Sequence, residues 1–149
     1  MSSVYPVWWD STITVYNKYE DPQTNLVTWY RTVLNGCFWK YTGQHINVGG
    51  TVIQTNDSIC RIPKQTTYLN RGDWLNIPND QRDSYFTFSP GDIIIKGEVT
   101  DVVNEYVAGS RSSDLLKKYK GLQGCLEIKD VGVNVGIGRG MEHYLVRGD

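Results

Sequence analysis

The chain has 149 residues, of which 40% are hydrophobic and 21% are charged, and its formal net charge is -1. A chain of this length can bury roughly 70% of the surface that it exposes when unfolded, so it needs no metal or disulfide to fold as one domain. The fifteen basic residues form no block, which argues against a dedicated nucleic-acid-binding patch, and ten Tyr, five Trp and fifteen Gly favour strands and tight loops over helices.

Residues 1–10 are expected to form an N-terminal arm that precedes a single barrel-like domain, residues 11–149. The arm lacks the basic start, apolar stretch and cleavage site of a signal peptide, and no apolar run approaches the roughly 20 residues that span a bilayer. We therefore expect a soluble protein that is made in the cytoplasm. Trp8 and Trp9 stand side by side in the arm. They either fold back over an edge of the core or insert into a partner, because two exposed Trp side chains would form an apolar patch.

The domain is expected to begin with a β-hairpin. Residues 12–16 alternate with the period of two that is typical of a half-buried strand, and residues 26–34 form the next strand. Asp21-Pro22 between them is typical of a turn. Asn35-Gly36 then predicts a tight turn, because this pair accepts positive φ, and it leads into a strand at residues 37–41.

A further strand is predicted at residues 58–62 and ends at Pro63, which cannot donate a hydrogen bond to a sheet. The polar, irregular stretch at about 63–84 predicts a long loop, and such a loop in a compact domain is usually functional or is ordered by a partner. It contains Arg71, Asp73 and Trp74. Arg-Gly-Asp at 71–73 and again at 147–149 is interpreted as solvated turns, with receptor recognition as the alternative.

The second half of the domain contains the clearest strand. Ser-Pro-Gly-Asp at 89–92 predicts a β-turn, and residues 92–96 follow as a strand. Its three consecutive isoleucines suggest burial on both faces, inside a closed barrel or under a covering loop. Gly97 is expected to mark a bulge or bend.

One short α-helix is predicted at about residues 113–120, with Asp near its start and Lys near its end. A helix of about two turns depends on docking, here through Leu115, Leu116 and Tyr119. Strands at 126–129 and 144–147 are expected to close the domain. A glycine-rich link, 132–140, separates them.

The sequence gives no sign of catalysis or of metal binding. Cys37, Cys60 and Cys125 have irregular spacings, which predicts three buried thiols in a reducing cytoplasm. His45 and His143 have no metal-ligand spacing around them, and no nucleophile elbow is present. The glycine-rich segment 136–140 lacks the ending of a phosphate-binding loop, so it predicts a hairpin or assembly loop around Arg139. We therefore expect no enzymatic activity, no metal and no cofactor.

Several stretches together resemble a family of small proteins that phages and prophages of Gram-positive bacteria encode among their head-tail joining genes. These stretches are residues 12–19, 30–33 and 36–39, Ser58 with Ile62-Pro63, residues 86–97, and residues 143–146. The Pro-Gly-Asp turn into an apolar strand, together with a final strand that carries His and an aromatic residue, is also similar to head-closure proteins, called stoppers. Tyr144 stands where relatives are expected to have Trp.

The resemblance implies a β-barrel that forms a ring beneath the portal and adaptor, with loops that help retain DNA in the lumen. The region around residues 71–80 would then face the lumen or a ring contact. We expect an all-β fold, a small barrel or sandwich with long loops. The expected mechanism is mechanical, with edge strands and loops that pair with neighbouring subunits.

The expected function is that of a structural virion protein in the neck of a tailed bacteriophage, assembled in the host cytoplasm. Its expected partners are copies of itself in a six- or twelve-fold ring, the portal, adaptor and tail proteins, and packaged DNA through non-specific contact. No contact with a membrane is expected. The alternatives are a tail terminator or tail-completion protein, a minor capsid protein and, from the Trp and Tyr content alone, a small carbohydrate-binding module or hydrolase. The predicted interface residues are Trp8, Trp9, Arg71, Asp73, Trp74, Arg139, His143 and Tyr144.

Overall fold

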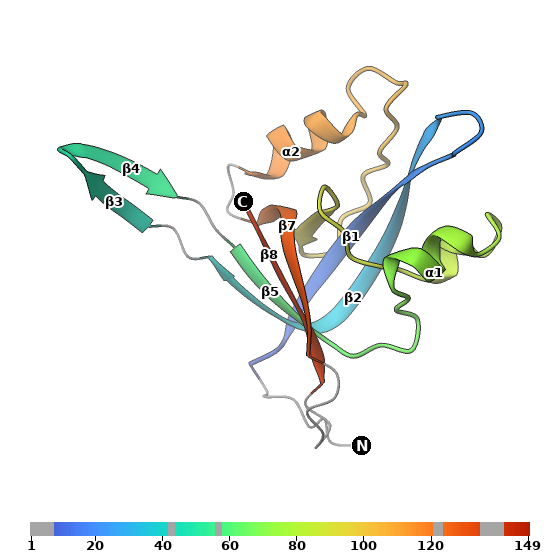
Figure 1. Ribbon diagram of the computed structural model, residues 1–149, viewed down its shortest axis with the longest axis horizontal. Coiled ribbons are helices and arrows are strands. Elements are labelled where there is room, and N and C mark those ends of the chain that lie inside the picture. The colour runs from blue at the N-terminus through green and yellow to red at the C-terminus, as the bar shows by residue number, and fades with distance from the viewer. Residues whose placement is uncertain (1–7, 42–43, 56–57, 121–123, 135–141) are drawn as a thin grey trace.

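The computed structural model describes residues 8–41, 44–55, 58–120, 124–134 and 142–149. Six antiparallel strands close into a barrel in the order β1-β2-β5-β8-β7-β6, and a separate two-stranded sheet pairs β3 with β4 (Figure 1). The predicted all-β barrel is therefore confirmed. The barrel strands are β1 (Ser11–Glu20), β2 (Val27–Tyr41), β5 (Ser58–Pro63), β6 (Ile93–Lys96), β7 (Cys125–Asn134) and β8 (His143–Gly148).

The β1–β2 hairpin was predicted, but the role of Asn35-Gly36 was not. β2 continues through this pair, and the register between β1 and β2 shifts by one residue there, because Ser11 faces Cys37 whereas Ile13 faces Leu34. Gly36 has φ 72, so the positive φ that suggested a turn instead forms a β-bulge. The prediction of a tight turn is wrong. The extra residue bends a long strand without ending it.

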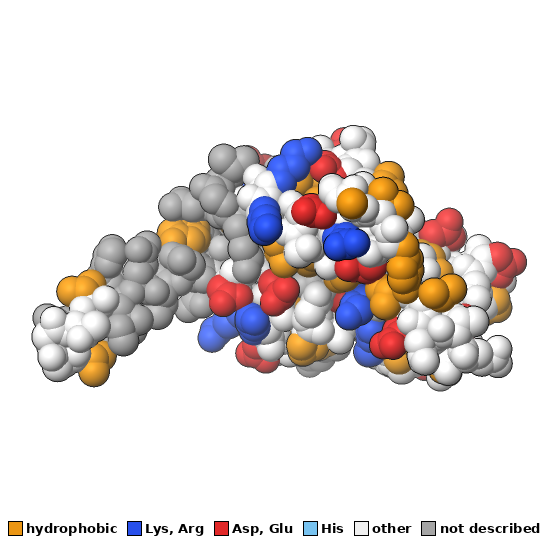
Figure 2. All heavy atoms as spheres, turned by 90° about the horizontal axis from the view of Figure 1, so that it is seen from above, with side chains coloured by type: hydrophobic (Ala, Val, Ile, Leu, Met, Phe, Trp, Pro, Cys, Tyr) orange, Lys and Arg blue, Asp and Glu red, His pale blue; other side chains and the backbone are white. Residues whose placement is uncertain are grey.

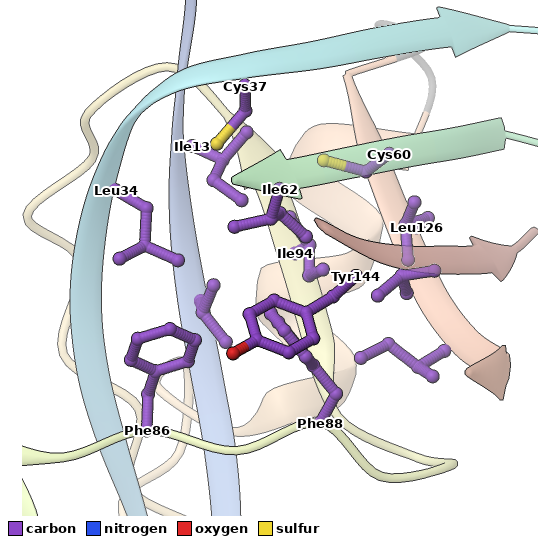
Figure 3. Close-up of a cluster of buried hydrophobic side chains, with 13 residues drawn as sticks. Ile13, Leu34, Cys37, Cys60, Ile62, Phe86, Phe88, Ile94, Leu126 and Tyr144 are labelled. Atoms are coloured by element: carbon purple, nitrogen blue, oxygen red, sulfur yellow. The ribbon is translucent and has the colours of Figure 1, made fainter. Parts of the chain in front are cut away.

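β6 confirms the burial that its three isoleucines predicted. Ile94 faces the interior of the barrel, in a cluster with Ile13, Val15 and Leu126. Figure 3 shows this inner cluster, with side chains from several strands converging on it. Ile93 and Ile95 face outward into a second cluster beneath the helix α2 (Ser112–Lys120).

The helix α2 lies where the sequence predicted it. Leu115 is buried in the outer cluster, and Leu116 and Tyr119 pack against that cluster. The predicted turn at 89–92 is also present, because the Asp92 N–H donates to the Ser89 carbonyl oxygen at 3.0 Å and Gly91 has φ 95. Pro90 and Gly91 are thus the central residues of this turn.

The stretch at 63–84 is not an unstructured loop. It contains a second short helix, α1 (Arg71–Asn76), and a 3-10 helix, η1 (Arg82–Ser84). The Asn70 side chain caps α1 by accepting a hydrogen bond from the Asp73 N–H. The first Arg-Gly-Asp copy therefore opens a helix and is not a solvated turn, and the prediction of a single helix is wrong.

Candidate assembly surface

A hairpin that was not predicted from the sequence is formed by β3 (Gln44–Val48) and β4 (Thr51–Thr55). It projects away from the barrel (Figure 1). Its two strands are joined by Gly49 and Gly50, whose φ values are 57 and 85. Positive φ at both central residues is typical of a type I′ turn, the two-residue turn that matches the twist of a hairpin.

The hairpin has two features that suit pairing with another chain. β3 and β4 pair only with each other among the described strands, so each has a second edge whose backbone groups are unpaired there. The twelve residues from 44 to 55 include no Lys, Arg, Asp, Glu or Pro, although 21% of the whole chain is charged. Proteins commonly protect exposed edges with such residues. This edge is not protected.

Val48 and Val52 lie beside the turn of the hairpin and are 57% and 64% exposed. A second group of exposed apolar side chains lies in the segment before α2, where Val102 is 79% exposed, together with Tyr106 and Val107. Figure 2 shows hydrophobic atoms on the projecting hairpin and others on the main body of the molecule. The hairpin and the segment that leads into α2 are separate parts of the fold (Figure 1).

The two tryptophans of the arm have different environments. The Trp9 ring packs against Phe38 and contacts the His143 ring edge-to-face, with centroids 5.5 Å apart. Trp8 is 65% exposed. Of the two alternatives for this pair, folding back over the barrel therefore describes Trp9, whereas Trp8 stays exposed.

His143 lies at the start of β8, where an Arg61 Nη1 approaches its Nε2 at 2.9 Å. Arg61, Trp9 and His143 thus meet at one end of the barrel. Tyr144, the next residue, points inward and is 2% exposed, stacked on Tyr68 with ring centroids 4.1 Å apart. The prediction that Tyr144 is an interface residue is wrong, because its ring belongs to the core.

Trp74 was wrongly predicted as an exposed anchor for the same reason. It is fully buried, and its ring contacts Tyr19 and Tyr30 edge-to-face. These two tyrosines lie on β1 and β2, so Trp74 fastens α1 to the barrel. Asp73 remains exposed and accepts a hydrogen bond from the Asn70 side chain. Arg139 lies outside the described residues.

Arg71 joins α1 to a buried carboxylate. Its Nη2 donates to the Lys18 carbonyl oxygen at 2.9 Å, and its Nη1 lies 3.8 Å from Oδ2 of Asp92. Asp92 is 1% exposed and accepts hydrogen bonds from the Asn17 side chain and the Lys18 N–H. Burial raises the pKa of Asp92 to about 6, while these hydrogen bonds and Arg71 act in the opposite direction.

Asn17 completes this polar cluster inside the barrel end. Its amide also donates to the Thr87 carbonyl oxygen and accepts from the Thr87 N–H. The cluster therefore connects β1, α1 and the turn before β6. Most of its oxygen and nitrogen atoms make contacts within the chain, which is the arrangement of a structural network. Within the described part of the chain, Arg71 Nη1 and the buried Thr87 hydroxyl have no hydrogen-bond partner. Arg71, Asp73 and Trp74 thus lie together in α1. Trp9 and His143, which contact each other, are both distant from α1 in the sequence.

The prediction of three buried cysteines is confirmed, because Cys37, Cys60 and Cys125 are all buried. Burial beside Cys37 raises the pKa of the Cys60 thiol well above its usual value. Among the residues that the structure describes, no three His, Cys, Asp or Glu side chains gather where they could hold a metal ion. Neither described helix has the length and apolar character that a membrane crossing needs.

These features define a small closed antiparallel barrel with an unprotected, projecting hairpin. The chain matches a family of unknown function, DUF6751, over residues 8–149, and it belongs to that family. None of the curated proteins and none of the solved structures compared with the chain gives a match.

The sequence contained signals for part of this surface. Gly49-Gly50 between apolar and β-branched residues is a recognisable hairpin signal, and the absence of charge around it is visible in the sequence. The apolar surface of Val102, Tyr106 and Val107 had no comparable signal. Single exposed apolar residues are common in proteins, and only the fold shows which of them lie together.

Proposed function

We propose that the chain is a structural protein of the neck of a tailed bacteriophage, a head-closure ring component that joins the portal and adaptor to the tail. Copies of the chain would assemble into a ring, and the ring would help to retain packaged DNA. The function is mechanical, so it requires stable contacts between subunits and no chemical step.

The projecting β3–β4 hairpin is the observation that carries this proposal. An isolated two-stranded hairpin is at best marginally stable in water, and here its edges have no partner strand among the described residues. The six barrel strands satisfy one another in a closed sheet, so the barrel itself does not need another chain. A compact scaffold that carries one extended, unprotected element is well suited to assembly with neighbours.

The region around residues 71–80 supports a more limited role than DNA retention. Arg71 and Trp74 are engaged with the barrel, whereas Asp73 and Leu75 are exposed. An exposed acid beside an exposed apolar side chain favours contact with a protein over contact with phosphates. We therefore assign this region to a subunit contact and leave the lumen to other segments.

The same architecture is compatible with a tail terminator, a tail-completion protein or a minor capsid protein, which also form rings or lattices. A carbohydrate-binding module or hydrolase has less support. The aromatic content that suggested it is largely occupied in packing, with Trp74, Tyr16 and Tyr144 buried.

Deletion of the gene from the phage or prophage that encodes the chain tests the proposal. We expect capsids that have lost their DNA, together with complete free tails, in electron micrographs of the lysate. DNA-filled heads without tails would favour the terminator, and infectious particles of normal yield would contradict any neck function. A plasmid copy of the intact gene is the control, because it must restore normal particles.

Purified components give an independent test. Mixed with the portal and adaptor proteins encoded in the same genome, the chain is expected to add a ring to that complex in negative-stain images. A deletion of residues 44–55 that joins the strands on either side should leave the far-UV spectrum of the barrel in place. We expect that variant to add no ring.

A further inference from the structure

We infer that His143 is the pH-sensitive part of a latch that holds the N-terminal arm on the barrel. The latch consists of Trp9 of the arm, His143 at the start of β8 and Arg61 of β5. At neutral pH Arg61 binds the His143 ring, and the ring supports Trp9. Protonation of His143 breaks the first contact and releases Trp9. This inference concerns the single chain, so it does not depend on the proposed function.

The contact between Arg61 and His143 requires a neutral imidazole. Arg61 Nη1 lies 2.9 Å from Nε2 of His143. A guanidinium group has N–H donors and no acceptor, so Nε2 must accept with its lone pair, and the neutral ring carries its proton on Nδ1. A protonated ring has an N–H on both nitrogens. It therefore cannot make this hydrogen bond, and it places a second positive charge beside that of Arg61.

The His143 ring is one of two aromatic supports of Trp9. The Trp9 and His143 rings meet edge-to-face at 83° with centroids 5.5 Å apart, and the Trp9 ring lies 6.3 Å from that of Phe38. Phe38, Arg61 and His143 belong to the three adjacent strands β2, β5 and β8. A His143 ring that turns away from Arg61 takes the edge-to-face contact with it, so Trp9 keeps only the contact with Phe38.

The acid that precedes His143 in the sequence is already paired. Glu142 Oε2 lies 2.9 Å from Lys64 Nζ, so Glu142 brings a positive charge of its own to this end of the barrel. Asp10 follows Trp9 in the arm and is exposed, so water screens it strongly. Neither acid removes the conflict between a protonated His143 and Arg61.

The other charged groups on the strands around the ring lie in a row further along the barrel. His143 faces Pro63 and Asn134, and the row crosses the sheet four residues away from these positions. Four residues of extended strand span roughly 13 Å, which is more than the distance over which salt screens exposed charges. Arg61 therefore dominates the electrostatic environment of the ring. The row consists of Lys40 on β2, Arg147 on β8 and Asp130 on β7.

Release of the latch would change the surface of the chain. Histidine in an ordinary environment is the side chain whose charge changes between pH 5 and pH 8. Trp9 would then be exposed beside Trp8, which is 65% exposed already. Two adjacent exposed tryptophans form an apolar surface of the kind that anchors a partner. The two alternatives for this pair, packing on the barrel and contact with a partner, thus become two states of one arm.

Fluorine NMR measures the state of Trp9 directly. The full chain is labelled with 5-fluorotryptophan, and the Trp9 signal is identified by its loss in Trp9→Phe. The change in its chemical shift between H2O and D2O reports exposure to solvent. We expect the ratio of released to bound arm to rise at least about tenfold from pH 8 to pH 5.5, because a charge in contact commonly shifts a protonation equilibrium by that factor or more. The signal of buried Trp74 is the internal reference and should not change.

Three substitutions separate the parts of the latch. His143→Gln keeps a neutral acceptor for Arg61, so Trp9 should stay bound at both pH values. His143→Lys supplies a fixed positive charge and should release Trp9 even at pH 8. Arg61→Gln removes the opposing charge, and its amide can accept from a protonated ring, so acid should no longer release Trp9. His45→Gln replaces the other histidine of the chain. It is the matched control and should respond to pH like the wild type.

Trp9 that is equally shielded from solvent at both pH values in the folded wild type overturns the latch. Release of Trp9 by acid in His143→Gln overturns it as well. If the far-UV spectrum shows that His143→Lys does not fold, Arg61→Gln still decides, because a response to acid that persists in this variant contradicts the role of the like charges. The neck function fails separately, if gene deletion leaves infectious particles.

Discussion

The guanidinium carbon of Arg82 lies 3.8 Å from the centroid of the Tyr19 ring, and the Arg82 side chain is buried, with only 1% of its surface exposed. It donates hydrogen bonds to the backbone carbonyls of Trp74, Leu75 and Ile77, and its Nη1 donates to the Asn79 side-chain oxygen. The three backbone carbonyls lie at the end of α1, where a short helix cannot satisfy them by itself. One buried cation thus ends the helix and joins it to β1.

Because the guanidinium group of Arg82 donates several hydrogen bonds at once, even the conservative substitution Arg82→Lys is expected to lower stability strongly. Arg82→Lys retains the charge but cannot reach three carbonyl oxygens at once, so we expect the free energy of unfolding to fall by about 2–3 kcal/mol. Urea denaturation followed by tryptophan fluorescence measures it. Arg147→Lys, at an exposed position of β8, is the control and should change the value by less than about 0.5 kcal/mol. Equal effects of both substitutions would contradict this role of Arg82.

Asp92 predicts a specific pH dependence of stability. Its pKa rises from 3.8 to about 6 in the folded chain, chiefly through burial, so the folded state holds the proton more tightly than the unfolded state. The stability that this group contributes is therefore complete below about pH 4 and is lost as the pH rises through 6, by about 3 kcal/mol in total.

Asp92→Asn removes this titration, so the difference in unfolding free energy between wild type and variant should change between pH 4 and pH 7. Denaturation curves at half-unit intervals measure it. Comparing the two proteins cancels the contributions of other carboxylates, such as Asp101, whose pKa is lowered by hydrogen bonds from Tyr119 and Lys118. Parallel pH profiles would show that Asp92 does not titrate in this range.

Trp74 and Trp8 have different environments, so their replacement by Ala should change the stability of the chain by very different amounts. Trp74→Ala removes a fully buried ring and is expected to cost about 3–5 kcal/mol of stability. Trp8→Ala should change stability by less than about 0.5 kcal/mol, because Trp8 is 65% exposed. Thermal unfolding in a calorimeter measures both. A stable Trp74→Ala variant would contradict the packing of α1 on the barrel.

Two strand glycines form a further matched pair. A Cβ atom at Gly148 would overlap the backbone oxygen of Glu127, whereas one at Gly132 would meet nothing closer than 3.8 Å. Gly148→Ala is therefore expected to cost about 2–3 kcal/mol or more, because β8 must move away from β7. Gly132→Ala should be neutral or slightly stabilising. Similar melting temperatures for the two variants would contradict the close approach at Gly148.

The sequence predicted the elements whose local pattern matches their final environment. The three isoleucines of β6 and the capped α2 are examples, since a buried strand and a docked helix each leave a clear pattern of residues. The helix α1 left no such pattern. Its six residues are too few for a helical period, and its stability comes from contacts of Arg71 and Trp74 with distant strands.

The errors at Asn35-Gly36, Trp74 and Tyr144 have a shared physical origin. A positive φ suits a turn and a bulge equally, and only the pairing of β1 with β2 decides between them. Aromatic side chains stabilise cores and interfaces by the same burial of area, so residue type cannot distinguish the two uses. The hairpin at 44–55 is different. It had a local signal in Gly49-Gly50, which the sequence analysis missed.

The alternating isoleucines of β6 have a consequence for how the molecule opens. Ile94 faces the inner cluster, while Ile93 and Ile95 face the outer one, so a single short strand contributes to both clusters. Helix α2 cannot detach without exposing Ile93 and Ile95. The barrel cannot lose β6 without removing the surface on which the helix packs. The two layers should therefore melt together as one cooperative unit, and amides in α2 and β6 should exchange with solvent through the same opening event.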